Sequence, residues 1–189
     1  MAGKGAAKNK KKVKQDKGVL IYQDEATFEQ AGTVCQHWAE KGVGCEVKSF
    51  PTRKRAKVIG AVVVGAKPKW HFSFTERFNG KSFLRFLKRL VKHYQGTKIH
   101  MIVDNARFHK TKEIGKWLKK NTHKIELHFL PPYSPEFNAT EYVWKETKKK
   151  TTHNRYFPTL DELKQRLFRR FNRFQGNPAS LRNILASFA

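Results

Sequence analysis

Two aspartates in this sequence share a setting in which side chains often do chemistry. Asp24 directly follows the apolar run GVLIYQ (18–23), and Asp104 directly follows KIHMIV (98–103). If these runs are neighbouring parallel strands, both carboxylates meet at one edge of the sheet, where ligand sites gather. Two close carboxylates repel unless a cation joins them, and magnesium commonly uses protein carboxylates. Each Asp alone fits a turn residue, but the pair in so basic a chain favours a metal site.

A third acid, Glu141, falls in the first turn of a helix predicted to start at Asn138. From there its side chain can reach back over the same sheet edge. The local alternative is a capping box, in which Glu141 bonds the backbone of Asn138. Glu136, in the preceding loop, is the alternative third ligand. Glu25 is adjacent to Asp24 but is expected to face the other way if the strand continues.

The elements that must position these acids follow from hydrophobic periodicity and turn signals. Three strands with short connections predict an antiparallel meander, and the later alternation of strands and helices predicts parallel additions with crossover helices. We therefore expect an α/β fold with a mixed five-stranded sheet, three antiparallel strands followed by two parallel ones, flanked by helices. The predicted strands are 18–23, 57–66, 69–76, 98–103 and 124–130, and the predicted helices are 82–96, 111–120, one from Asn138 and a last one from Thr159.

Charge identifies the expected partner. The chain has 40 Lys and Arg against 15 Asp and Glu, a formal net charge of +25. Such an excess favours binding to nucleic acid through phosphate neutralisation, with an anionic membrane surface as the second possibility. No stretch approaches the roughly 18 apolar residues of a membrane span, and the N-terminus lacks the apolar core of a secretory signal, so we expect a soluble intracellular protein. Residues 1–17 are predicted to be a disordered basic arm, and residues 18–189 a single catalytic domain ending in a basic helix.

Three segments resemble the catalytic blocks of a known family. YQDEATF (22–28), IVDNARFHK (102–110) and LPPYSPEFNATEYVWKETKK (130–149) are similar to those of DDE transposases of the mariner superfamily, in the prokaryotic insertion-sequence branch. The resemblance implies a ribonuclease-H-like fold, with Asp24, Asp104 and Glu141 as catalytic, metal-binding acids. It also implies two Mg²⁺ or Mn²⁺ ions, DNA cleavage and strand transfer, transposon ends and target DNA as partners, and a homodimer when active.

The resemblance has one departure and one open assignment. Ala139-Thr140 replaces the family's usual Pro-Ile or Pro-Val, which loosens the loop but leaves the acid in place. His109 matches a family histidine, for which a basic role near phosphate and a plain structural hydrogen bond both remain open. Trp144, one turn after Glu141, is expected to pack under the sheet rather than contact bases.

Basic residues near these blocks are the expected DNA contacts. They are Lys145, Lys148, Lys149 and Lys150 on the helix after Glu141, His109, and Arg166 and Arg170 on the last helix. Because only the basic arm precedes the first catalytic strand, the chain resembles a catalytic domain without the helix-turn-helix modules that read transposon ends. The alternatives are an idle or truncated transposase remnant that only binds DNA, another nuclease of the same fold, and a structural basic protein. The expected location is a prokaryotic cytoplasm, in association with the nucleoid.

Overall fold

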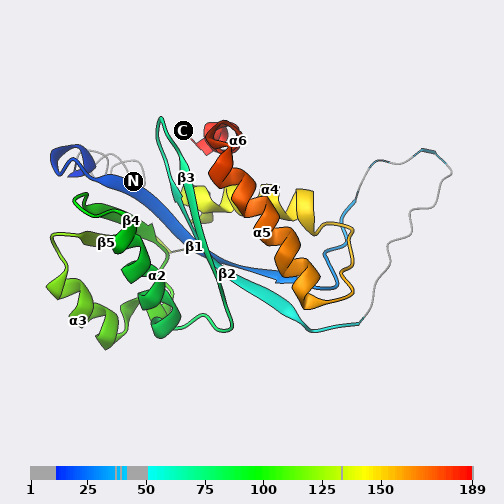
Figure 1. The fold of residues 1–189 in the computed structure, drawn as a ribbon, viewed down its shortest axis with the longest axis horizontal. Coiled ribbons are helices and arrows are strands. Elements are labelled where there is room, and N and C mark those ends of the chain that lie inside the picture. Colours follow the sequence, from blue (N-terminus) through cyan, green and yellow to red (C-terminus); the bar gives the residue numbers. More distant parts are fainter. Residues whose placement is uncertain (1–11, 37, 39, 42–50, 133, 189) are drawn as a thin grey trace.

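A computed structural model of the protein describes residues 12–36, 38, 40–41, 51–132 and 134–188. A five-stranded sheet in the order β3-β2-β1-β4-β5 forms its centre (Figure 1). β1 pairs antiparallel with β2 and β2 with β3, whereas β4 runs parallel to both β1 and β5. This confirms the predicted mixed sheet. The strands are β1 (Val19–Glu29), β2 (Arg55–Val63), β3 (Lys69–Thr75), β4 (Ile99–Val103) and β5 (Ile125–Phe129).

Helices cover both faces of the sheet. α2 (Gly80–His93) and α3 (Lys112–Lys120) lie on one face, and α4 (Ala139–Thr151), α5 (Leu160–Gly176) and α6 (Pro178–Leu185) lie on the other (Figure 1). Successive strand residues point to opposite faces, so Leu20 and Tyr22 join the core beneath α4 and α5, while Ile21 joins the core beneath α2. All five residues of β4 are buried, as expected for a parallel strand covered on both faces.

β1 is longer than the sequence predicted, and this corrects the position of Asp24. The strand continues to Glu29, with Asp24 opposite Gly60 of β2. Its parallel pairing with β4 runs only from Val19 to Tyr22, which lies opposite Ile102. β4 ends at Val103, so Asp104 does follow a strand end as predicted. Asp24 instead lies within a strand that extends past β4 because the antiparallel pairing with β2 continues.

The predicted disordered arm is corrected at its C-terminal part. Residues 12–15 are helical, and Val13 packs against the core on the α4 side of the sheet. Nζ of Lys98 lies 2.8 Å from Oδ2 of Asp16. These contacts attach residues 12–17 to the sheet, whereas residues 1–11 lie outside the described part of the chain.

The helix starts that were predicted from capping residues are present. Asn138 is the N-cap of α4 and Thr159 the N-cap of α5, each accepting a backbone N–H with its side chain. The prediction that the helix from Thr159 is the last one is wrong, because Asn177 caps the short helix α6, which has Pro178 in its first turn. Among the described helices, none has the length and apolar content needed to cross a membrane.

Candidate active site

Three acids from three separate elements line one cavity. Asp24 lies within β1, Asp104 follows the end of β4, and Glu141 lies in the first turn of α4. The cavity has a volume of about 420 Å³, and another part of its wall is formed by Leu130, Pro131, Pro132, Ser134 and Asn138. The fold therefore brings together the three acids that the sequence singled out.

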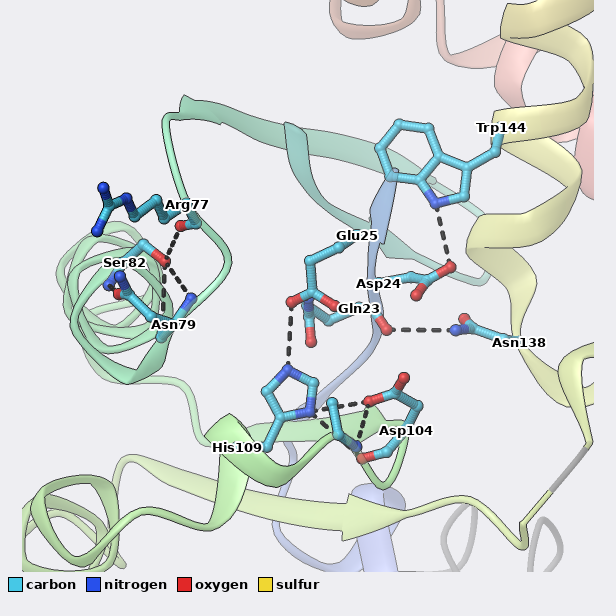
Figure 2. Close-up of polar contacts among 11 residues, drawn as sticks. Gln23, Asp24, Glu25, Arg77, Asn79, Ser82, Asp104, His109, Asn138 and Trp144 are labelled. Atoms are coloured by element: carbon cyan, nitrogen blue, oxygen red, sulfur yellow. Dashed lines mark hydrogen bonds and ion pairs between the residues drawn. The ribbon is translucent and has the colours of Figure 1, made fainter. Parts of the chain in front are cut away.

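The carboxylate of Asp24 is fixed by the indole of Trp144. Nε1 of Trp144 donates a hydrogen bond to Oδ2 of Asp24 at 3.2 Å (Figure 2). The indole is 2% exposed and crosses β2 at Gly60, where an added Cβ would lie 2.4 Å from Cη2 of Trp144. Packing of Trp144 under the sheet is thus confirmed, and the hydrogen bond to the acid is an additional role that the sequence did not indicate.

The electrostatics of Asp24 reflect its crowded surroundings. Burial raises the pKa of Asp24 to about 8, and the negative charge of Glu141 acts in the same direction. A buried carboxylate near other carboxylates is costly unless a cation compensates the charge. This part of the cavity is therefore one where a bound cation would be stabilised.

Asp104 is oriented through one of its two oxygens. Oδ1 accepts a hydrogen bond from the backbone N–H of Ala106 at 2.9 Å and lies 3.0 Å from Nδ1 of His109 (Figure 2). The hydrogen bond with His109 lowers the pKa of Asp104. Because both partners use Oδ1, Oδ2 is the oxygen that the described residues leave available to a ligand.

His109 connects Asp104 to Glu25 on the other face of β1. The ring is 1% exposed, and its Nε2 lies 3.2 Å from Oε1 of Glu25, which also accepts from Nε2 of Gln23 at 2.8 Å (Figure 2). Burial lowers the pKa of His109, but hydrogen bonds to Asp104 and Glu25 outweigh it and raise the pKa to about 9. Glu25 does face away from Asp24, as expected. Since His109 is buried, the predicted DNA contact is corrected in favour of the structural hydrogen bond.

Glu141 is exposed at the start of α4 and does not form the capping box that was the local alternative. Oδ1 of Asn138 accepts from the backbone N–H of Thr140 at 3.2 Å, and Nδ2 of Asn138 donates to the carbonyl of Gln23 at 3.3 Å. The second bond ties the start of α4 to β1 next to Asp24. Glu136, the alternative acid, lines an adjoining cavity that Glu141 shares, and it is absent from the lining of the cavity that contains the aspartates.

The predicted DNA-contacting residues fall into two groups. Lys145 and Lys148 line the adjoining cavity beside Glu141. Lys149, Lys150 and Arg166 are exposed. Arg170 is corrected: its side chain is 15% exposed, and its Nη2 lies 3.1 Å from Oε1 of Glu146, with the guanidinium over the ring of Phe174. Arg170 is therefore less accessible to phosphate than the exposed Lys149, Lys150 and Arg166.

The donor set fits a hard divalent cation. Carboxylate oxygens suit Mg²⁺ and Mn²⁺, and Asp24, Asp104 and Glu141 supply three carboxylates around one cavity. Ligand atoms of Glu25, Asp104 and His109 also lie within 4.8 Å of one another. Both ring nitrogens of His109, however, face carboxylate oxygens at hydrogen-bonding distance, so they act as donors and this second group does not offer a metal ligand on the ring.

Sequence and structure comparisons place the chain in a family. A family model described as DDE superfamily endonuclease matches residues 19–164, and the chain belongs to this family. It is 36% identical over 145 residues to the insertion element IS630 uncharacterized 39 kDa protein of Shigella sonnei, covering 76% of this chain and 42% of that protein. It is 30% identical over 89 residues to the uncharacterized protein y4pE/y4sA of Sinorhizobium fredii, covering 47% of this chain and 62% of that protein. The chain thus spans less than two thirds of either relative.

Solved structures share the fold. A Mos1 transposase paired-end complex with the left transposon end aligns over 99% of this chain and 60% of the Mos1 chain, with a TM-score of 0.60 and 14% identity. The catalytic domain of Mos1 mariner transposase aligns over 96% of this chain and 87% of that chain, with a TM-score of 0.51 and 13% identity. The resemblance inferred from the three sequence blocks is confirmed, and with it the ribonuclease-H-like fold class.

Proposed function

We propose that this chain is the catalytic domain of an insertion-element transposase, which cuts DNA strands and transfers the freed ends to target DNA. The observation that supports this most is the common cavity lined by Asp24, Asp104 and Glu141. Membership of the DDE superfamily endonuclease family supports the same reaction class. A domain that binds DNA without cutting it is not favoured, because it would not require three carboxylates in one cavity.

In this proposal Asp24, Asp104 and Glu141 would bind two Mg²⁺ or Mn²⁺ ions. When bound, such ions supply charge stabilisation for the attacking and leaving oxygens of phosphoryl transfer. The chain's own contribution is positioning. Trp144 fixes the carboxylate of Asp24. His109 and the backbone of Ala106 fix Oδ1 of Asp104 and leave Oδ2 for the ion.

The DNA backbone would pass beside Glu141. Lys145 and Lys148 line the cavity that adjoins the acids, and Lys149, Lys150 and Arg166 extend the positive surface. The partners proposed are transposon ends and target DNA, and the active form proposed is a homodimer. One of the similar Mos1 structures is a paired-end complex of that transposase with a transposon end. The location proposed is the prokaryotic cytoplasm, at the nucleoid.

A cleavage assay tests the proposal. The chain is incubated with duplex DNA that carries an insertion-element end, in Mg²⁺ or Mn²⁺, and strand breaks are measured. We expect metal-dependent breaks that disappear in Asp104→Asn and Glu141→Gln but persist in the matched variant Glu136→Gln. DNA binding without cleavage by the unmodified chain, under conditions where it is folded, would support the binding-only alternative instead.

A further inference from the structure

A second group of potential metal ligands lies on the sheet away from the three acids. His100 of β4 and Glu126 and His128 of β5 share one face of the sheet, and one ligand atom of each lies within 4.8 Å of the other two. His100 pairs opposite Glu126 in the β4–β5 register, and His128 lies two residues further along β5. None of the three lines the cavity of Asp24, Asp104 and Glu141.

The two imidazoles have the spacing of ligands to one ion. Nδ1 of His100 lies 3.1 Å from Nε2 of His128. Two metal–nitrogen bonds of about 2.05 Å, at angles between octahedral and tetrahedral, separate the nitrogen atoms by about 2.9–3.4 Å. The distance between the nitrogens therefore matches that of two ligands to one ion, and turning the two rings so that both lone pairs point to the ion would replace the hydrogen bond between them.

The surroundings of His100 provide a second, independent observation. The side chain of His100 is fully buried, and its Nε2 lies 3.0 Å from Oδ2 of Asp16. Histidines that bind metals usually direct their other nitrogen to a carboxylate, which is the place that Asp16 occupies. Gly18 crosses directly over the ring, where an added Cβ would lie 2.9 Å from Cδ2 of His100.

Two lysines compete for the carboxylate of this group. Nζ of Lys12 donates to Oε1 of Glu126, and Nζ of Lys98 lies 3.5 Å from Oε2 of Glu126. A divalent ion that binds Oε1 would displace Lys12, whose side chain is 44% exposed on the segment 12–17. Since an exposed ion pair contributes little to stability, displacing Lys12 costs little free energy. Substitution of Lys12 is therefore expected to change the affinity of the site for the ion.

We propose that His100, His128 and Glu126 form a binding site for a first-row transition-metal ion, with Zn²⁺ as the probe. Two imidazoles and one carboxylate favour Zn²⁺ over Mg²⁺, in contrast to the all-carboxylate set of the candidate active site. The ion would cross-link β4 and β5 directly. Because β4 leads into Asp104, and β5 leads into the loop before Glu141, the cross-link would stabilise the strands that carry two of the three acids.

Calorimetric titration of the full chain with Zn²⁺ tests the site. The protein is first freed of metal with a chelator and then titrated in millimolar Mg²⁺, so that the hard-cation site is saturated. We expect one Zn²⁺ per chain, with affinity weakened more than about tenfold in His128→Asn, since even partners outside the ligand set typically contribute tenfold or more. The matched variant is His123→Asn, which removes an exposed histidine between α3 and β5. It is expected to bind Zn²⁺ as tightly as the unmodified chain does.

Two further variants distinguish Zn²⁺ binding at this group from Zn²⁺ binding at the three acids. Asp24→Asn is expected to keep the Zn²⁺ affinity, and Lys12→Met is expected to tighten it by up to about fivefold, as for loss of an exposed ion pair. If His128→Asn does not fold, Glu126→Gln, with a side chain 32% exposed, replaces it. The proposal is overturned if no Zn²⁺ binds at micromolar concentrations, if neither ligand variant weakens binding, or if Asp24→Asn abolishes it.

Discussion

Nε2 of His109 lies 3.2 Å from Oε1 of Glu25, and Nδ1 of the same ring lies 3.0 Å from Oδ1 of Asp104. The acid that follows Asp24 in the chain thus contacts the second catalytic candidate through a buried histidine. This arrangement gives Glu25 a positioning role rather than a place among the proposed metal ligands.

The first prediction concerns this link. Glu25→Gln and His109→Asn are expected to weaken Mn²⁺ binding and to slow cleavage by about 10–100-fold, the usual effect of losing a group that orients a metal ligand. Mn²⁺ affinity and cleavage rate are to be measured at several Mn²⁺ concentrations, with His123→Asn as the exposed control. If Glu25 and His109 orient the metal ligand, the cleavage rate should recover in part at high Mn²⁺ concentration. A residual cleavage rate that does not depend on Mn²⁺ concentration would contradict this role.

The second prediction uses the two buried tryptophans. Trp144→Phe removes the N–H that donates to Asp24, whereas Trp70→Phe removes an N–H that has no partner in the described residues. Both changes delete similar volume from the same aromatic cluster, in which the two rings lie 5.0 Å apart. In urea unfolding, we expect Trp144→Phe to lower the free energy of unfolding by about 1–2 kcal/mol, and Trp70→Phe to lower it less, because only Trp144→Phe removes a hydrogen bond. Only Trp144→Phe is expected to slow cleavage. Equal cleavage losses would show that packing alone matters.

The third prediction distinguishes the lysines beside the candidate active site from Arg170, which is largely buried between α4 and α5. The double variant Lys145→Ala, Lys148→Ala is expected to lower the dependence of log K on log salt by about 1.8 for duplex DNA, at about 0.9 per phosphate contact. Arg170→Ala is expected to leave that slope unchanged and to lower the free energy of unfolding, because its guanidinium pairs with Glu146. If Arg170→Ala also lowers the salt dependence of DNA binding, Arg170 contacts DNA after all.

The fourth prediction concerns acid stability. Burial lowers the pKa of His71 to about 4, and the charges of His93, Arg89 and Lys69 act in the same direction. The unfolded chain takes up a proton near the ordinary histidine pKa of about 6.5, but the folded chain resists it until about pH 4, so the free energy of unfolding should fall as pH drops through this range. The loss is at most about 3.4 kcal/mol. Urea unfolding at several pH values between neutral pH and about pH 4 should show that the free energy of unfolding falls less steeply for His71→Gln than for the unmodified chain. Equal slopes for the two proteins would contradict the assignment of this acid sensitivity to His71.

The main elements of the fold could be predicted from the sequence because their apolar periodicity is strong. The succession of strands along the chain follows from apolar runs such as KVIGAVVVGA, KIHMIV and KIELHFL, the parallel addition of β4 and β5 follows from the helices between them, and the start of α4 follows from Asn138. The extension of β1 through Asp24 and Glu25 could not be predicted, because these polar residues carry no strand signal of their own. Their conformation is decided by pairing with β2.

In the candidate active site, too, the features set by neighbouring residues in the sequence could be predicted, and those set by tertiary contacts could not. The three acids could be identified because Asp24 and Asp104 directly follow apolar runs in the sequence, and Glu141 lies in the first turn after the helix-capping residue Asn138. The contact of Glu25 with His109 joins residues 84 positions apart, and the burial of Arg170 depends on Glu146 of another helix. The anchoring of residues 12–17 depends on Lys98 and Glu126 in the same way. No local pattern specifies such partners.

The most direct test of the central claim is anomalous diffraction from crystals of the chain grown with Mn²⁺. We predict anomalous density between the carboxylates of Asp24, Asp104 and Glu141, and its loss in isomorphous crystals of Asp104→Asn. Density between Glu25 and His109, with none beside Asp24 and Glu141, would contradict the assignment of the three acids as the metal-binding, catalytic set.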